Sequence, residues 1–247
     1  METPSDTNAI NSLARPRATR VLPPLIFASL VCAAMLAARY VHTGQVRFTG
    51  LFGNLLLAWI PMVFALVVNR LHKAAIPRRH WLWFCSVCWF FFFPNAPYIV
   101  TDIIHLKKYG LDGVPKWFDL LVIMAHACAG LFLGCLSLYF MELLVRERFG
   151  RRIGWSFAIG MLALGSFGIY LGRFVRLNSW DVLIRPFKLL TDIAALAAPM
   201  KAGEVLAFSV TFFFFSLAAY WFVTSTTQFH AADAESTAVA PGFPARR

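Results

Sequence analysis

Hydrophobic residues in this chain come in long runs, separated by short stretches that carry most of the charge. Six runs hold about 20 mostly apolar residues each, the length that an α-helix needs to cross the roughly 30 Å hydrocarbon core of a bilayer. Because lipid offers no partners to backbone N–H and C=O groups, we expect each run to be a helix. The predicted spans cover residues 21–39, 51–69, 81–100, 118–143, 154–174 and 205–224.

Composition supports a bilayer as the solvent of this chain. Of its 247 residues, 59% are hydrophobic and 14% are charged, whereas an ordinary soluble domain has about 25% charged residues. The predicted fold class is therefore all-α, a polytopic membrane helical bundle of six transmembrane helices over residues 21–225. The polar ends, residues 1–20 and 226–247, are expected to be disordered.

The basic residues predict a topology and not a nucleic-acid partner. The formal net charge is +11, but Lys and Arg lie in loops between the spans, so we expect no nucleic acid to bind. More of them lie on the side that holds both termini, which predicts a multi-pass inner-membrane protein with both termini in the cytoplasm. The first run could instead be a signal peptide, since "AAMLAARY" resembles a cleavage region, but its apolar length favours a retained span.

The third run is interrupted by the sequence "FPNAPYIVTDIIHL", residues 93–106. Pro94 and Pro97 must kink or end the helix, because each removes a backbone donor and clashes with the preceding turn. Asn95 is a candidate to cap a helix that restarts behind the break. One face of that restarted helix would carry Thr101, Asp102, His105 and Lys108. Irregular backbone at such depth is tolerated only where it is buried in protein or lines a wet cavity.

A second polar stretch, "GRFVRLNSWDVLIRPFKLLTD", follows the fifth run at residues 172–192. Arg173, Arg176 and Trp180 share one helical face, and Asn178 or Ser179 can cap a new helix. That helix, near residues 179–198, is predicted to be interfacial or re-entrant, because it carries one charged stripe on an apolar body. The stripe consists of Asp181, Arg185, Lys188 and Asp192.

Both stretches are predicted to face the same extracytoplasmic surface, because the loops after the third and fifth spans lie on one side of a six-span protein. Lys107, Lys108 and Asp119 fall on that side too. This coincidence is the strongest indication of function in the sequence.

Four features inside the spans receive structural interpretations. Glycine pairs at Gly130 and Gly134, and at Gly168 and Gly172, predict close packing of the fourth and fifth helices. Asn54 and Pro61 indicate a kink in the second helix. His126 is expected to be a neutral group bonded to a neighbouring helix, although an ionisable residue in a span can also be functional. Glu142 and Arg146, four residues apart, are expected to form a surface pair.

The two polar motifs resemble a family of small bacterial integral membrane proteins of unknown function. The resemblance covers roughly residues 50–225 and implies a polytopic membrane protein, without a substrate or assigned residue roles. The motif residues that match are Pro94, Asn95, Pro97, Tyr98, Thr101, Asp102, His105, Arg173, Arg176, Asn178, Ser179, Trp180 and Asp181.

Side-chain chemistry suggests roles for these residues. Asp102 and His105 suit an acid–base pair, because a carboxylate can orient and charge a neighbouring imidazole. They could instead be solvated at the headgroups, or be half of a metal site that Asp119 or Asp181 completes. No metal site is predicted, because only two ligands are near in sequence. The candidate ligand-binding residues are Asn95, Tyr98, Thr101, Arg173, Arg176, Asn178, Trp180 and Asp181.

Arginine suits an anionic ligand, since the guanidinium is a planar fork of donors. The alternative is that Arg173 and Arg176 snorkel to lipid phosphates, and that Trp180 belongs to an aromatic belt. The resulting hypothesis is a polar extracytoplasmic pocket in the lipid bilayer that binds an anionic lipid or lipid-linked small molecule. The alternatives are an intramembrane enzyme acting on a lipid-linked substrate, with Asp102 and His105 as its catalytic residues, a small transporter, and a non-catalytic envelope scaffold. The sequence leaves open whether a reaction is catalysed and which cofactors or protein partners take part.

Overall fold

The computed structural model of the chain describes residues 18–46, 48–74, 79–108, 113–176, 191 and 199–239. Side chains are placed at these positions except at 18–20, 105–108, 199–201 and 228–239. The described part is helical and contains no strand. Its elements are α2 (Ala18–Thr43), α3 (Thr49–His72), α4 (Arg79–Phe92), α5 (Asn95–Tyr98), η1 (Ile99–Lys108), α6 (Lys116–Phe149), α7 (Arg151–Tyr170), η2 (Leu171–Val175) and α10 (Pro199–Val239).

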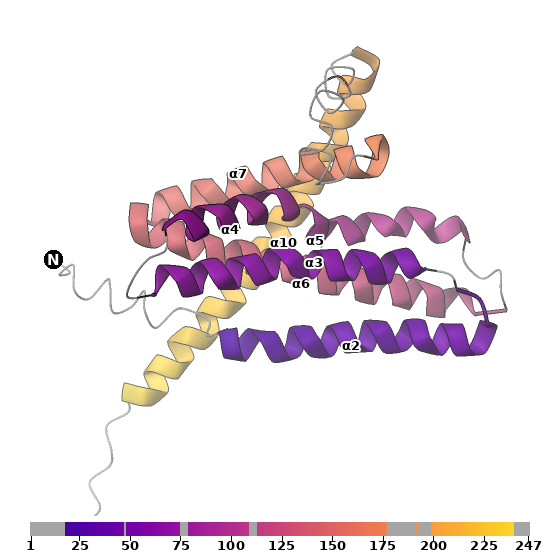
Figure 1. Cartoon of the computed structure of the whole chain (residues 1–247), viewed down its shortest axis with the longest axis horizontal. Helices are drawn as coiled ribbons and strands as arrows, with labels where there is room; N and C mark the ends of the chain where they lie inside the picture. Colours follow the sequence, from indigo (N-terminus) through magenta and orange to yellow (C-terminus); the bar gives the residue numbers. More distant parts are fainter. Residues whose placement is uncertain are drawn as a thin grey trace, which may run out of the picture.

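Six helical stretches in the described residues are long and apolar enough to cross a membrane. The all-α membrane bundle predicted from the hydrophobic runs is thereby confirmed, with α4, α5 and η1 together forming the third span. In Figure 1 most of the helices run along the long axis of the molecule, and α10 crosses the others obliquely. The spans are Val21–Thr43, Thr49–His72, Arg79–Ile104, Lys116–Phe149, Arg151–Val175 and Ala202–Thr227.

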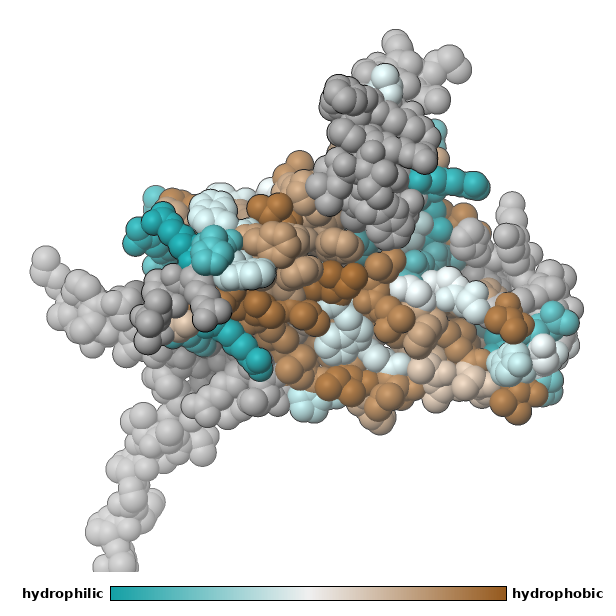
Figure 2. Space-filling view, viewed as in Figure 1, coloured by the Kyte–Doolittle hydropathy of each residue, from teal (hydrophilic) through white to brown (hydrophobic). Residues whose placement is uncertain are grey.

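The surface has the pattern expected of a protein embedded in lipid. Figure 2 shows hydrophobic side chains across the middle of the visible face, with hydrophilic side chains gathered toward the two ends. Exposed tryptophans lie near both ends, Trp81 and Trp83 at the start of α4 and Trp117 at the start of α6. Tryptophan prefers such interfacial positions because its ring is apolar and its N–H is polar.

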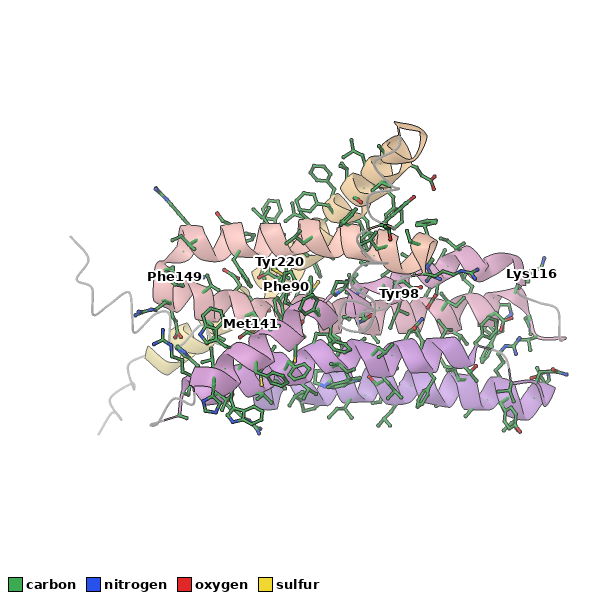
Figure 3. All side chains as sticks on the ribbon, turned by 45° about the horizontal axis from the view of Figure 1, so that its top comes forward. Phe90, Tyr98, Lys116, Met141, Phe149 and Tyr220 are labelled. Atoms are coloured by element: carbon green, nitrogen blue, oxygen red, sulfur yellow. The ribbon has the colours of Figure 1, made fainter. Side chains whose placement is uncertain are left out.

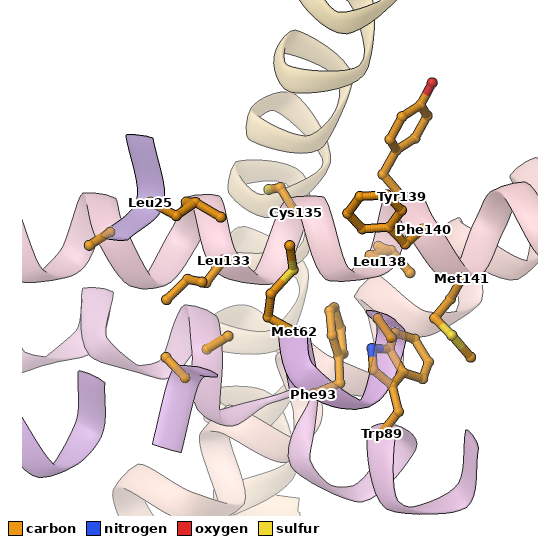
Figure 4. Close-up of a cluster of buried hydrophobic side chains, with 14 of the residues drawn as sticks. Leu25, Met62, Trp89, Phe93, Leu133, Cys135, Leu138, Tyr139, Phe140 and Met141 are labelled. Atoms are coloured by element: carbon orange, nitrogen blue, oxygen red, sulfur yellow. The ribbon is translucent and has the colours of Figure 1, made fainter. Parts of the chain in front are cut away.

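Helix α6 is the central element of the bundle. It contacts α2, α3, α5, α7, α10 and η1. Its two ends, labelled by Lys116 and Phe149 in Figure 3, lie at opposite ends of the molecule and are called here the Lys116 end and the Phe149 end. Figure 4 shows the buried core beside it, where Trp89 packs against Phe93 with ring centroids 5.2 Å apart.

Two glycines of α6 allow the broken third span to approach its backbone closely. A Cβ atom on Gly130 would lie 2.6 Å from the carbonyl oxygen of Ala96, and one on Gly134 would lie 3.2 Å from the Cδ of Pro97. Both distances are shorter than an ordinary van der Waals contact, so only glycine fits without displacement of the neighbours.

Glycines of α7 meet the same segment from another side. A Cβ on Gly165 would lie 3.0 Å from the ring of Phe93, and one on Gly168 would lie 3.2 Å from Pro94. Helices α6 and α7 do contact each other, as the glycine pairs suggested. These four glycines of α6 and α7, however, also accommodate the broken segment, because its backbone and its proline and phenylalanine rings lie against them.

The chain ends differ in part from the expectation of disorder. Helix α10 continues to Val239, so residues 226–239 extend the last span as helix. Residues 1–17 and 240–247 lie outside the described residues, as does nearly all of the interfacial helix predicted near 179–198.

Candidate functional site

The site begins at the double-proline kink. Helix α4 ends at Phe92, and α5 starts at Asn95 after a two-residue turn. Backbone hydrogen bonds cross the turn, from Ala96 N to Phe93 O at 3.2 Å and from Tyr98 N to Pro94 O at 3.1 Å. The third span therefore kinks and continues.

Asn95 does not take the capping position expected of it. Pro94 is the N-cap of α5, and no side chain makes a cap hydrogen bond there. The reason is that the backbone stays close to helical through the turn, so the chain has no separate helix start for Asn95 to cap. Asn95 is instead the first residue of α5.

Beyond α5 the chain continues as a 3₁₀-helix, η1, of 10 residues. A 3₁₀-helix has about three residues per turn, so positions three apart share one face. One face of η1 therefore has the positions of Asp102, His105 and Lys108, and Thr101 lies on a different face, in line with Tyr98. This differs from the single α-helical face that was expected. Thr101 and Asp102 are each 6% exposed, so the alternative of a solvated Asp102 at the headgroups does not fit. The side chain of His105 lies outside the described part of the chain.

The partner of this segment is the irregular end of the fifth span. Helix α7 passes at Leu171 into η2, a π-helical turn that contains Arg173. Arg176 follows as the C-cap with φ of 61°, in the left-handed region. Single π turns within α-helices are rare and occur frequently at functional sites.

The two irregular segments meet in an ion pair between Arg173 and Asp102. Nη2 of Arg173 contacts Oδ1 of Asp102, and the two side chains are 10% and 8% exposed. Arg173 Nε donates to Thr101 Oγ1 at 2.8 Å. The guanidinium also lies 4.3 Å from the ring centroid of Tyr98, a cation–π geometry. Three residues of the motif thus bind one arginine.

The second oxygen of the carboxylate is satisfied from another helix. Asn54 of α3 donates through Nδ2 to Asp102 Oδ2 at 2.9 Å. The hydroxyl of Thr101 donates to the carbonyl oxygen of Tyr98 at 2.6 Å, which leaves its lone pairs for Arg173. A buried ion pair is tolerated when further hydrogen bonds satisfy its remaining atoms, and both oxygens of Asp102 are bonded in this way. We call Asn54, Tyr98, Thr101, Asp102 and Arg173 the arginine cluster.

His126 lies beside the arginine cluster on α6. It is fully buried, and the helix that carries it contacts η1. Its Nδ1 lies 2.6 Å from the carbonyl oxygen of Val122, so this nitrogen carries the proton. The expected bond to a neighbouring helix is therefore replaced by one within α6. Its Nε2 has no hydrogen-bond partner among the described residues.

A second buried ion pair joins α2 to α6 nearer the Lys116 end. Arg39 Nε lies 2.8 Å from Asp119 Oδ1, and Nη2 lies 3.4 Å from Oδ2. The two side chains are 1% and 0% exposed, and the guanidinium lies 4.6 Å from the ring centroid of Phe48. The carboxylate of Asp119 is thus bound to an arginine instead of completing a metal site with Asp102.

The remaining candidate residues are not part of the arginine cluster as described. Arg176 is exposed, which suits an arginine that reaches toward solvent or lipid phosphate. Asn178, Trp180 and Asp181 lie outside the described residues. Where side chains are placed, no three His, Cys, Asp or Glu residues come close enough to hold a metal ion.

Sequence reasoning missed two residues of these buried pairs, Asn54 and Arg39. Asn54 had been interpreted as a kink residue, because an amide inside a span says nothing about its partner. Arg39 stands where the first hydrophobic run ends, so the sequence groups it with the loop charges. The only sequence signal was polarity at the edge of an apolar run.

The comparisons with known proteins agree with the resemblance noted for the motifs. A family described as a protein of unknown function, DUF1361, matches residues 54–219. The whole arginine cluster falls within the matched range, from Asn54 to Arg173. No curated protein and no solved structure matches the chain.

Proposed function

This chain belongs to the DUF1361 family, and we propose that it is a multi-pass membrane protein that binds an anionic ligand at the pair of Asp102 and Arg173. The ligand is a phosphate or carboxylate group, free or on a lipid. The observation that carries the proposal is a buried ion pair joining two irregular helix segments within the spans. Ionisable side chains are expensive within a membrane and mark ligand or ion sites by default.

The ligand binds by exchange with the carboxylate of Asp102. Arg173 is already bonded to Asp102 and Thr101, so an incoming anion has to take the place of Asp102. The planar guanidinium group can donate two parallel hydrogen bonds to a phosphate or to a carboxylate in the same geometry. Asp102 is then neutralised by a proton, so that one anion and one proton enter together and the buried charge stays balanced.

Groups around Asp102 suit the handling of that proton. The unbonded Nε2 of buried His126 lies on the neighbouring helix, and His105 lies one 3₁₀ turn after Asp102 in η1. Asn54 can bond either form of the carboxyl group, because its amide has both donor and acceptor atoms. The acid–base role that the sequence suggested for Asp102 and His105 is thus extended to His126 and Asn54.

Basic residues around the arginine cluster favour an anion over a cation. Lys107 and Lys108 end η1, and Lys116 and Arg176 are exposed. The two buried arginines are each paired with an aspartate. The exposed charges described at this end are Lys116, Arg176 and, on α10, Glu204, so positive charge is in excess there. Such an excess raises the local concentration of anions. Because more Lys and Arg lie in the loops on the other side, we propose that this surface faces the extracytoplasmic side of the inner membrane.

Binding can be measured on the purified protein in nanodiscs. The two probes are inorganic phosphate in neutral phosphatidylcholine nanodiscs and phosphatidylglycerol added to the nanodisc lipids. Asp102→Asn frees Arg173 and should tighten binding about tenfold or more, since tenfold corresponds to only about 1.4 kcal/mol. Arg173→Lys should weaken it, because a lysine cannot form the fork. If the variants change the binding of phosphate only, the ligand is a free anion. If they change the binding of phosphatidylglycerol only, the ligand is a lipid.

The other ion pair provides the matched control. Asp119→Asn breaks a buried pair of the same chemistry on α6 and should leave anion binding unchanged. If Asp102→Asn and Arg173→Lys bind both probes as the wild type does, the arginine cluster only holds helices together. Equal tightening by Asp119→Asn would equally exclude a specific site.

A further inference from the structure

We propose that Glu142 is a proton-binding site in the half of the bundle toward the Phe149 end. Its carboxyl group takes up and releases a proton within the membrane-spanning part of α6. The proposal concerns a different site from the arginine cluster and does not depend on anion binding.

Glu142 is buried, contrary to the surface pair expected from its spacing to Arg146. It is 2% exposed and lies seven residues before the end of α6 at Phe149, about 10 Å along the helix axis. Figure 3 shows its neighbour Met141 on the Phe149 side of the bundle. Spacing of four residues places two side chains on one helix face, but it does not say which other helix covers that face.

Helices α7 and α10 cover this carboxyl group. Tyr220 of α10 donates its hydroxyl to Glu142 Oε2 at 2.8 Å, and Tyr220 is itself fully buried. On the α7 side, a Cβ atom on Gly154 would lie 3.4 Å from Oε1. Oε1 is buried and has no hydrogen-bond partner among the described residues. One carboxyl oxygen is thus bonded and the other is open.

Among the described residues, no cation is bonded to Glu142. Arg146 of α6 and Arg151 of α7 act on it electrostatically, but neither is among its described salt bridges or hydrogen bonds. The other titratable neighbours are Tyr139 of α6 and Tyr220 of α10. This differs from Asp102 and Asp119, each of which contacts an arginine.

An unpaired ionised carboxylate in a low-dielectric interior is costly, and a proton removes that cost. The proton adds to a lone pair of Oε1 and forms an O–H bond, while Oε2 keeps the hydrogen bond from Tyr220. Release breaks the O–H bond and returns the proton to water. No other reactant is required.

Infrared difference spectroscopy of the protein in nanodiscs tests this proposal. At neutral pH the wild type should show the carbonyl stretch of a buried protonated carboxylic acid, and this band should disappear as the pH is raised. Glu142→Gln should abolish the band, whereas Asp119→Asn should leave it, because Asp119 is held by Arg39.

Isotope labelling keeps the test decisive if Glu142→Gln does not fold. Labelling all glutamate carboxyl groups with ¹³C in the wild type shifts only glutamate bands, and Glu142 is the buried glutamate of the described residues. A protonated band that moves with the label supports the proposal. Absence of such a band, or a band that stays in Glu142→Gln or fails to shift, overturns it.

Discussion

Arg173 and Asp102 are 71 residues apart in the chain and form an ion pair inside a membrane-spanning bundle. Each belongs to a segment that is not α-helical, Asp102 to a 3₁₀-helix and Arg173 to a π turn. A polar network in a low-dielectric interior rigidifies the structure when every member is satisfied. The pair therefore fixes the relative position of the third and fifth spans.

Breaking this pair from one side should be more harmful than removing both charges. Arg173→Gln leaves the Asp102 carboxylate buried without its cation, and we expect a loss of about 3–5 kcal/mol in the free energy of unfolding. Adding Asp102→Asn should recover a large part of this loss, because no charge then remains buried. Unfolding of the purified variants in detergent measures both. Equal losses in the single and double variants would contradict the assigned pairing.

Asn54 should matter more than a similar asparagine of the same helix. It donates to the charged carboxylate of Asp102 at 2.9 Å, and a bond to a charged group is worth about 1.5–3 kcal/mol. Asn69 provides the control, since it donates to the backbone carbonyls of Ala65 and Phe140. These carbonyls lie inside α3 and α6 and already accept helical hydrogen bonds, so removal of the amide leaves neither of them unsatisfied. We expect Asn54→Leu to lower the unfolding temperature more than Asn69→Leu, and the reverse order would count against the arginine cluster.

The contact between α6 and the kinked segment can be tested by adding one methyl group. In Gly130→Ala the new Cβ would lie 2.6 Å from the carbonyl oxygen of Ala96, so we expect a loss of about 1–3 kcal/mol. Gly160 of α7 has no atom within 4 Å of such a Cβ. Gly160→Ala should therefore be neutral or stabilise the helix by up to about 1 kcal/mol. Similar unfolding temperatures for the two variants would show that the kink is not held this closely.

The proposed topology predicts the outcome of reporter fusions. Alkaline phosphatase fused after residue 110, between the third and fourth spans, should be active because that loop is predicted to be periplasmic. A fusion after residue 150, between the fourth and fifth spans, should be inactive as phosphatase and fluorescent as a green fluorescent protein fusion. The opposite pattern would place the arginine cluster on the cytoplasmic side.

The sequence predicted the spans well because a span requires only length and apolarity. It also pointed to Asp102 and Arg173, because charged residues stand out beside hydrophobic runs. It did not reveal that the two bind each other, since that depends on how the third and fifth helices pack. Glu142 was misjudged for the same reason: its burial comes from α10, whose contact with α6 has no sequence signal.

Local geometry was the other limit of sequence reasoning. Proline forbids a regular helix at residues 94 and 97, but it does not decide between a break and a kink. The glycines of α6 and α7 that surround the segment favour the kink. Neither the 3₁₀ form of η1 nor the π turn at Arg173 could be predicted, because short irregular helices have no hydrophobic period of their own.

The 3₁₀ form of η1 makes the third span longer than the same residues would be as an α-helix. Its 10 residues would be about 5 Å shorter if rewound as an α-helix, because the rise per residue falls from about 2.0 to 1.5 Å. We expect neutralisation of Asp102 to release the segment from Arg173 and to let it rewind, so that protonation of one carboxyl group shortens the third span. Spin labels at the exposed positions Ile104 and Leu164 should report this shortening as a changed distance between the labels in Asp102→Asn. An unchanged distance would show that η1 keeps its 3₁₀ form without the ion pair.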